Sequence, residues 1–378
     1  MRILFLSANV GVGHIAAAQA VEAALRQMEP GLHSRVVDSY RYAALVVSKI
    51  VADGYLRMVK RTPQLYRYVY DRAERATEVG RFRTWAHQFT AGNLRPLILE
   101  ERPDAVVCTH AFPCGAMAEY KRAFPDAPPV VAIVTDFAVH GFWIHDNIER
   151  YIVATTGMRD ALLARNVPRH AISVTGIQVR PAFAPSGEPR ATLRERLDLP
   201  RDRFVVLVMG GGLGIAPLER ILGALTAVRV PLAAVVVAGR NRKIEARLAA
   251  VAEKAEYPVR SLRFVDNVYD YMHAADVLVT KPGGLTTAEA LVAQIPLVLC
   301  KPLPGQEERN ARVLTEAGAA VPTRKVEEIS RVLEVVLTDE AARGGLIRAG
   351  QRLAHPRAAG EAASLLAALV RERKESVA

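Results

Sequence analysis

Short runs of aliphatic and β-branched residues alternate along the first half of the chain with longer segments of helical periodicity. The apolar runs include RILFLSA, DAVVCTH, PVVAIVTDF and YIVATT, and the patterns between them include AAAQAVEAALRQM and CGAMAEYKRAF. Continuous apolar runs of this length, separated by helices, are typical of strands buried in a parallel sheet. The pattern therefore predicts a doubly wound α/β domain over residues 1–182.

The alternation stops in the middle of the chain and then starts again. The segment PSGEP gives residues 183–202 the composition of an inter-domain linker. Beyond it, FVVLVMGGG, LAAVVVAGRN, VLVTKPGG and PLVLCKPLPG predict a second series of strands over residues 203–355, and residues 356–378 have the pattern of an amphipathic helix. We expect an α/β protein with two Rossmann-like domains facing across a cleft, and a ligand between the carboxyl ends of their strands.

A segment of the first half, from about residue 40 to 93, interrupts the alternation. It is rich in arginine and tyrosine and carries aliphatic residues at helical spacing. One interpretation is an inserted pair of helices with a solvated basic face. The other is a membrane-docking surface, in which Val46, Val47, Ile50 and Val51 enter the headgroup region while basic side chains meet lipid phosphates. The sequence leaves both interpretations open.

Composition narrows the class of protein. The 378 residues are 51% hydrophobic and 24% charged, which is ordinary globular usage and enough for roughly two domains. Cys108, Cys114 and Cys300 form neither a disulfide framework nor a zinc motif, so we expect a reduced protein inside the cell. No apolar run approaches the ~20 residues of a spanning helix, and no secretory signal is recognisable. The net charge of +11 favours anionic partners without choosing among them.

The first candidate site is the stretch SANVGVGHIAAAQ, a strand end followed by a turn and a helix. Gly11 and Gly13 leave room for a ligand to approach the backbone amides, and His14 follows in the first helical turn. The stretch is neither a dinucleotide fingerprint nor a P-loop. The positive end of the helix dipole favours a neutral imidazole. His14 is therefore either a proton acceptor or a residue that merely caps the turn.

A second polar position follows another strand of the first half, in IVTDFAVHGFWIH. Asp136 comes directly after the apolar run, with His140 and His145 just beyond it. Because the carboxyl ends of parallel strands meet at one edge of a sheet, all three are expected at the same cleft. Asp136 would orient a catalytic imidazole or hold an acceptor hydroxyl. The spacing of these residues does not indicate a metal site.

In the second half, glycines follow three strands and offer backbone amides to phosphate oxygens. They occur in MGGGLG, with Gly211 and Gly212, in AGRN, with Gly239 and Asn241, and in TKPGGLTTAEA, with Gly283, Gly284, Thr286 and Glu289. In the last of these the order fits an amide cradle for a diphosphate followed by a carboxylate for ribose hydroxyls. A tight turn with a solvent-exposed glutamate is the alternative. In KPLPGQEERNA, the side chains of Gln306, Glu307 and Asn310 suit adjacent sugar hydroxyls.

Taken together and in order, these motifs resemble the family of monogalactosyldiacylglycerol synthases and processive diacylglycerol glucosyltransferases. That family is related to the enzyme that adds N-acetylglucosamine to the lipid-linked peptidoglycan precursor. The resemblance implies a GT-B fold of the GT28 type, with an N-terminal domain for a lipid acceptor and a C-terminal domain for a UDP-sugar. It also implies inversion at the anomeric carbon without a metal or other cofactor. The C-terminal helix of such enzymes often packs on the N-terminal domain.

The resemblance assigns roles residue by residue. His14 matches the histidine proposed as the base, and the segment from about 40 to 93 matches the membrane-associating region. By the resemblance, the diphosphate would be held by Gly283, Gly284, Leu285 and Thr286, the ribose by Glu289, and the sugar by Gln306, Glu307 and Asn310. From their place at glycine-bearing strand ends, and not from the resemblance, we expect Gly211 and Gly212 at the diphosphate and Gly239 and Asn241 at the nucleotide base.

The expected function is the inverting transfer of a hexose from UDP-glucose or UDP-galactose to a lipid hydroxyl, most simply that of diacylglycerol. We expect a peripheral protein on the cytoplasmic face of an anionic membrane, with no nucleic-acid partner. Three alternatives stay open. They are transfer of N-acetylglucosamine to a polyprenyl-linked acceptor, UDP-sugar 2-epimerisation, and nucleotide sensing at the membrane without catalysis.

Overall fold

The computed structural model describes residues 1–9, 12–43, 77–212, 216–240 and 242–377. Most of the segment expected to form a basic insert, including its four aliphatic positions from 46 to 51, lies outside these ranges.

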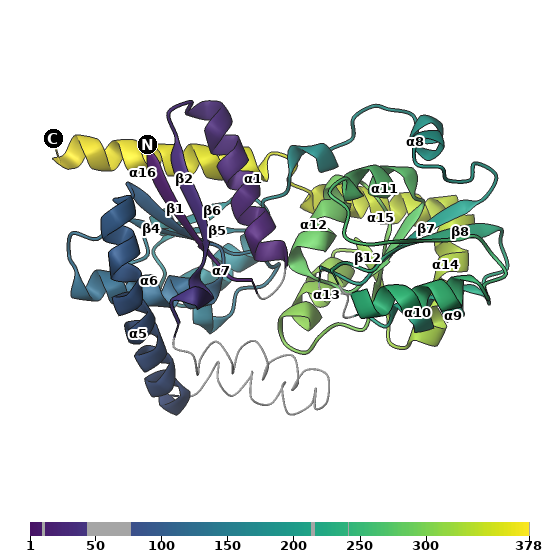
Figure 1. The fold of residues 1–378 in the computed structure, drawn as a ribbon, viewed down its shortest axis with the longest axis horizontal. Helices are drawn as coiled ribbons and strands as arrows, with labels where there is room; N and C mark the ends of the chain where they lie inside the picture. Colours follow the sequence, from purple (N-terminus) through teal and green to yellow (C-terminus); the bar gives the residue numbers. More distant parts are fainter. Residues whose placement is uncertain (10–11, 44–76, 213–215, 241, 378) are drawn as a thin grey trace. The chain divides into compact units, whose positions relative to one another are not determined.

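The chain divides into two compact units. The first comprises Met1–Val179, Pro304–Gln306 and Arg357–Ala378, and the second comprises Arg180–Leu303 and Glu307–Pro356. Each unit is built on a six-stranded sheet whose neighbouring strands are parallel (Figure 1). The expected α/β class with two Rossmann-like sheets is therefore confirmed.

In the first unit the strand order is β2-β1-β3-β4-β5-β6. Its elements in chain order are β1 (Arg2–Ser7), α1 (Val12–Met28), β2 (His33–Asp38), η1 (Ser39–Arg41), α5 (Thr77–Glu101), β3 (Ala105–Cys108), α6 (Ala111–Ala123), β4 (Val130–Ile133), η3 (Gly141–Trp143), β5 (Arg150–Val153), α7 (Thr156–Leu163), η4 (Arg169–Ala171), β6 (Ile172–Val174) and the C-terminal α16 (Ala358–Val377).

Helices α1 and α16 share one face of this sheet, and α16 lies beside α1 (Figure 1). Ala18 and Val21 of α1 join the same buried cluster as Ala362 and Leu366 of α16, and Leu366 is fully buried. Complete burial of one leucine side chain contributes about 1.5–3 kcal/mol. The last helix of the chain is therefore part of the core of the first unit. Helix α6 also packs against β3 and β4.

In the second unit the strand order is β12-β11-β10-β7-β8-β9. Its elements are η5 (Pro181–Phe183), α8 (Arg190–Arg196), β7 (Phe204–Met209), α9 (Leu218–Leu225), β8 (Leu232–Val237), α10 (Arg242–Ala252), β9 (Val259–Leu262), α11 (Val268–Ala274), β10 (Val277–Thr280), α12 (Gly284–Val292), β11 (Leu297–Cys300), α13 (Gln306–Glu316), β12 (Ala320–Thr323), η6 (Val326–Glu328), α14 (Ile329–Thr338) and α15 (Glu340–Leu353).

The segment expected as a linker carries α8 and is tied to the second unit. Arg194, at the end of α8, is 8% exposed, and its Nη2 donates to Oδ2 of Asp276 at 2.6 Å. Its Nε donates to the carbonyl oxygen of Ala274 at 2.9 Å. Because a buried guanidinium needs such partners, this contact fixes α8 beside α11.

The strand orders fix where each sheet can hold a ligand. In the first unit the order changes direction between β1 and β3, and in the second between β7 and β10. In open parallel sheets, ligands bind at such switch points, outside the carboxyl ends of the strands. Ligand sites are therefore expected at the turns after β1 and β3 in the first unit and after β7 and β10 in the second.

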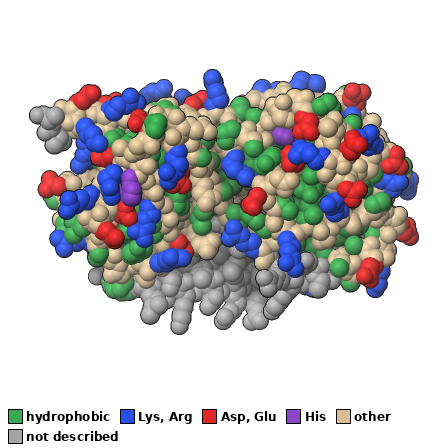
Figure 2. All heavy atoms as spheres, turned by 45° about the horizontal axis from the view of Figure 1, so that its top comes forward, with side chains coloured by type: hydrophobic (Ala, Val, Ile, Leu, Met, Phe, Trp, Pro, Cys, Tyr) green, Lys and Arg blue, Asp and Glu red, His purple; other side chains and the backbone are tan. Residues whose placement is uncertain are grey.

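Two surface observations bear on the expected membrane association. None of the helices in the described ranges is both long and apolar enough to cross a membrane. On the face drawn in Figure 2, lysine and arginine side chains are spread over the surface with acidic side chains among them. The positive excess of the chain is thus not gathered into one patch on that face.

Candidate functional site

The carboxyl edge of the first sheet brings together polar groups that follow three neighbouring strands. His14 lies in the first turn of α1, just beyond β1. Its Nδ1 lies 2.9 Å from the carbonyl oxygen of Thr109, which follows β3, and 2.8 Å from Oγ1 of Thr135, which follows β4. These two contacts fix the orientation of the imidazole at the switch point of this unit.

The same contacts define the tautomer of His14. A carbonyl oxygen only accepts hydrogen bonds, so Nδ1 of His14 carries the proton that is directed at Thr109. In the neutral ring Nε2 then has a free lone pair. Burial lowers the pKa of His14 below its ordinary value, while the negative charge of Asp136 and the carbonyl of Thr109 act in the opposite direction. The ring is therefore neutral near pH 7, with Nε2 able to accept a proton.

Asp136 follows β4 at the same edge and is 8% exposed. Its charge acts on His14, and its Oδ2 accepts a hydrogen bond of 3.1 Å from Nε2 of Gln306, a residue that belongs to the first unit. The structure thus brings His14, Asp136 and Gln306 into one cluster.

Two residues of this cluster, Thr109 and His110, were not singled out by the sequence. The rings of His110 and His14 are perpendicular, with centroids 4.7 Å apart. Nδ1 of His110 accepts a hydrogen bond from the amide of Phe112 and caps α6. Burial holds the pKa of His110 well below its ordinary value. Their position in the sequence could have indicated these two residues, because Thr109 and His110 directly follow an apolar strand, as Asp136 does.

The remaining candidates of the first half lie close by. Nδ1 of His140 accepts a hydrogen bond from the amide of Phe142, and Nε2 of His145 donates to the carbonyl oxygen of Phe142. Both histidines therefore have partners in the loop before β5. Gly13 precedes His14 in the first turn of α1, whereas Gly11 lies outside the described residues.

In the second unit, the turns after β7 and β8 pack backbone against backbone. Gly239 has a φ of +71°, and a Cβ atom there would lie 2.8 Å from the carbonyl oxygens of both Gly211 and Gly212. Gly211 also has a positive φ, of +73°. Only glycine fits this packing without strain. The turns form a side-chain-free surface at the carboxyl edge, and Asn241, just beyond, lies outside the described residues.

The turn after β10 leads into α12, and no capping side chain accepts a hydrogen bond from the first amides of this helix. Gly283 is the N-cap residue of α12 and supplies no side-chain hydrogen bond. The amides of Gly284, Leu285 and Thr286 occupy the first turn, where a helix has no acceptors of its own. Together with the positive end of the helix dipole, these unused amides are chemically suited to bind an anion.

Glu289 is 8% exposed, so the alternative of a solvent-exposed glutamate is wrong. Burial raises the pKa of Glu289 to about 8, while the positive charge of Arg180 lowers it. A carboxyl group with a raised pKa inside a buried site is a common feature of functional positions.

Lys281 is a further residue that the sequence did not single out. Its Nζ forms an ion pair with Oε1 of Glu307, and the side chain of Lys281 is 16% exposed. A Cβ atom on Gly211 would lie 2.6 Å from Cε of Lys281. The ammonium group is thus held among the glycine turns, close to the N-terminus of α12. The position of Lys281 directly after the apolar run of β10 could have indicated it as a site residue from the sequence.

Glu307 and Asn310, on α13, have partners within the second unit. Oε2 of Glu307 accepts a hydrogen bond of 2.8 Å from the amide of Leu303. Nδ2 of Asn310 donates at 3.1 Å to the carbonyl oxygen of Pro282, next to Lys281. Both side chains thereby brace the turn after β10. Among the described residues there is no group of three or more His, Cys, Asp or Glu side chains arranged to hold a metal ion.

Solved structures share this architecture over nearly the whole chain. MurG of Acinetobacter baumannii is 18% identical, with a TM-score of 0.61, and the match covers 96% of this chain and 98% of that one. UGT2 of Phytolacca americana, solved with UDP-2-fluoro-glucose and pterostilbene, is 14% identical, with a TM-score of 0.62 and coverage of 98% and 99%. Two Rossmann-like units of this topology are the GT-B fold, which these structures share with the chain.

The family follows from the sequence comparisons. Residues 14–179 match the family described as monogalactosyldiacylglycerol (MGDG) synthase, and residues 205–349 match the glycosyltransferase family 28 C-terminal domain. The processive diacylglycerol β-glucosyltransferase of Bacillus mycoides is 31% identical over 341 residues, which are 90% of this chain and 86% of that protein. The enzyme of the same name from Bacillus subtilis is 30% identical over 342 residues, with coverage of 90% and 87%. The chain belongs to this family of UDP-sugar-dependent glycosyltransferases.

Proposed function

We propose that this protein transfers glucose from UDP-glucose to the hydroxyl group of diacylglycerol, with inversion at the anomeric carbon. The relatives named as diacylglycerol β-glucosyltransferases support glucose over galactose and diacylglycerol over other lipid alcohols. In this reaction the acceptor oxygen bonds to C1 of the sugar as the bond from C1 to UDP breaks. The acceptor loses a proton, and UDP leaves with additional negative charge.

The observation that carries the proposal is the state of His14. Its Nδ1–H is engaged by Thr109, its pKa is lowered by burial, and its Nε2 has a free lone pair. His14 takes the proton of the acceptor hydroxyl, and the charge of Asp136 stabilises the imidazolium that forms. Gly13, which directly precedes His14, leaves space for the lipid glycerol beside this ring. The same role is proposed for Gly11 from the sequence alone.

The second unit holds the donor. The diphosphate lies on the amides of Gly283, Gly284, Leu285 and Thr286 and beside Gly211 and Gly212, and the nucleotide base lies beside Gly239. A contact of the base with Asn241 is proposed from the sequence alone. Lys281, central among these turns, neutralises the charge that develops on UDP. With amides and an ammonium group in this role, the reaction needs no metal ion.

The sugar is held by Gln306, Glu307 and Asn310. Each carboxylate oxygen accepts more than one hydrogen bond, and an amide NH₂ group donates two. The internal partners of Glu307 and Asn310 therefore leave capacity for sugar hydroxyls while fixing the direction of each side chain.

The acceptor is a membrane lipid, so we also propose peripheral association with the cytoplasmic face of the membrane. The segment from about residue 40 to 93 supplies the contact, because its aliphatic and basic composition suits an anionic interface.

The function is tested by measuring UDP release from UDP-glucose and UDP-galactose, each with and without diacylglycerol in anionic vesicles. We expect release that depends on diacylglycerol and is faster with UDP-glucose. Faster release with UDP-galactose would overturn the choice of donor. Sugar isomerisation without acceptor would indicate a 2-epimerase, release only with a polyprenyl-linked acceptor would indicate a different substrate, and no release at all would favour a sensor.

The pH dependence of donor binding tests the ribose role of Glu289. Two ribose hydroxyls that donate to Glu289 favour its ionised form, whereas burial raises the pKa of the free carboxyl to about 8. Binding of UDP-glucose therefore releases a proton, and its affinity should rise between pH 6 and 8, by up to about tenfold per pH unit, and level off above. Calorimetry in buffers of different ionisation enthalpy measures the proton release directly. In Glu289→Gln the pH slope should vanish; an unchanged slope would assign it to another group.

A further inference from the structure

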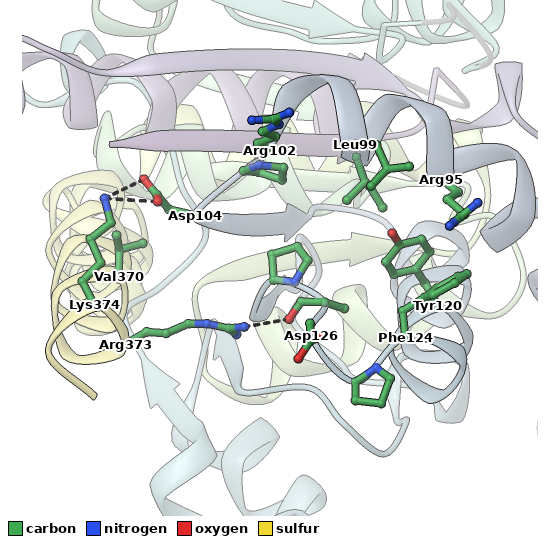
Figure 3. Close-up of a pocket in the computed structure, with 15 residues that line it drawn as sticks. Arg95, Leu99, Arg102, Asp104, Tyr120, Phe124, Asp126, Val370, Arg373 and Lys374 are labelled. Carbon is green, nitrogen blue, oxygen red and sulfur yellow. Dashed lines mark hydrogen bonds and ion pairs between the residues drawn. The ribbon is translucent and has the colours of Figure 1, made fainter. Parts of the chain in front are cut away.

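A cavity lies in the first unit (Figure 3). It is at the opposite edge of the sheet from His14. It has a volume of about 1040 Å³. Pro103 and Asp104, which line it, immediately precede β3, whereas Thr109 immediately follows this strand. A strand of four residues spans about 13 Å. The cavity is thus separate from the site at the carboxyl edge.

Three helices contribute apolar side chains to this cavity. Ile98 and Leu99 come from α5, Tyr120 from α6 and Val370 from α16, and Phe124 follows α6. Leu99 is 55% exposed, although a large aliphatic side chain is usually buried. Among these side chains the accessible apolar surface comes from Leu99 and the half-buried Phe124, whereas Ile98, Tyr120 and Val370 are buried behind it.

The charges that line the cavity are unequal in number. Arg95, Arg102, Arg373 and Lys374 face two carboxylates, Asp104 and Asp126. Arg95 and Leu99 are four residues apart on α5 and share a helical face, whereas Arg102 directly follows this helix with a positive φ of 42°. Figure 3 shows Arg102 and Leu99 on one side of the hollow and Arg373 on another.

The carboxylates are only partly matched to these cations. Asp104 pairs with Lys374 at 3.1 Å and also accepts a hydrogen bond from the amide of Arg2. Arg373 donates to the carbonyl oxygen of Ala127 at 3.0 Å. Within the described ranges Arg95 and Arg102 form no ion pair; the guanidinium of Arg95 lies 5.1 Å from the centre of the Phe124 ring. Two guanidinium groups thus remain beside an apolar wall.

We propose that this cavity binds one amphiphilic anion, an acyl chain that carries a carboxylate or a phosphate. The apolar walls take the chain, and the guanidinium group of Arg95 or of Arg102 takes the anionic group, for which its planar donors are well suited. The volume is at the upper end of the usual range for small-molecule sites. Because the surface is a hollow between three helices, it fits a single free molecule and not a flat bilayer.

Binding at this place connects α5 and α6 to the end of α16. A ligand that binds only the folded protein raises its stability, by an amount that grows with the logarithm of the ligand concentration above Kd. The occupied site should therefore raise the melting temperature and slow amide exchange in the last turns of α16, the helix that closes the core of the first unit.

The test is calorimetric titration of the full chain with oleate and with 1-oleoyl lysophosphatidate, both below their critical micelle concentrations. Inorganic phosphate tests the anion alone, and octyl glucoside tests a neutral amphiphile. We expect both acyl anions to bind at least about tenfold more tightly than either of these. The head group is identified by which of the two acyl anions has the higher affinity. Equal affinity for the acyl anions and octyl glucoside would overturn the proposal.

The variant for this test is Arg95→Gln combined with Arg102→Gln, both at exposed positions. It should weaken binding of the acyl anions by about ten- to a hundredfold, whereas Arg169→Gln, at an exposed arginine outside the cavity, should not change it. An unchanged affinity in the double variant would overturn the proposal. A second result would also overturn the proposal: neither the unaltered protein nor the double variant binds the free acyl anions, but the double variant loses binding to anionic vesicles. That result would indicate contact with a bilayer.

Discussion

Replacement of His14 by alanine is expected to lower the rate of glucose transfer by about 10²–10⁴-fold, the usual contribution of a general base. The proposed contacts to the diphosphate, the ribose and the nucleotide base lie in the second unit, so the affinity for UDP-glucose should remain nearly unchanged. Turnover and equilibrium binding of UDP-glucose, measured on the same preparation, separate the two effects. Turnover close to that of the unaltered protein would remove His14 from the mechanism.

The pH profile gives this prediction a second readout. Burial holds the pKa of His14 below its ordinary value of 6.5, so the ring should keep its basic form as the pH falls to that value. The acid limb of kcat/KM should therefore lie below pH 6.5 and disappear in His14→Ala. A matched control is His170→Gln, an exposed histidine in the same unit, which should leave both the rate and the acid limb unchanged.

The sequence predicted the elements of the site better than its contacts. The turn before His14 and the strand before Asp136 are local patterns, in which glycine and apolar runs determine the backbone. Thr109 orients His14 only because β3 lies next to β1, although 95 residues separate the two side chains. Such a pairing depends on strand order, which no local pattern encodes.

The second unit shows the same limit. Glu289 could be placed on a helix from its sequence, but its burial depends on how α12 packs, and this burial is what raises its pKa. Glu307 and Asn310 were predicted as sugar-binding residues, but no local pattern indicated their bonds to Lys281 and Pro282. These contacts join β10 to α13 across more than twenty residues of chain. The position of Lys281 among the glycine turns is a consequence of that packing.

Replacement of Lys281 by methionine is expected to lower kcat/KM by about 10²–10³-fold, because one preorganised charge at a developing anion contributes this much. The affinity for UDP, which carries the full charge of the leaving group, should fall as well. Methionine keeps most of the length of the side chain beside Gly211, so the turns keep their packing. The single variant also leaves Glu307 as a buried carboxylate without its cation, which lowers stability and complicates the measurement.

A double-mutant cycle with Glu307→Gln separates the two roles of Lys281. If Lys281 only neutralises Glu307, then Lys281→Met has no effect on UDP affinity once residue 307 is glutamine. If its ammonium group binds the diphosphate, the loss of UDP affinity persists in the Glu307→Gln background, even though the stability of the double variant recovers. UDP without a sugar is the ligand of choice, because contacts of Glu307 to the hexose then do not contribute. We expect the persistent loss, since Lys281 lies where the glycine turns and the first amides of α12 converge, and a cation there acts on the leaving group directly.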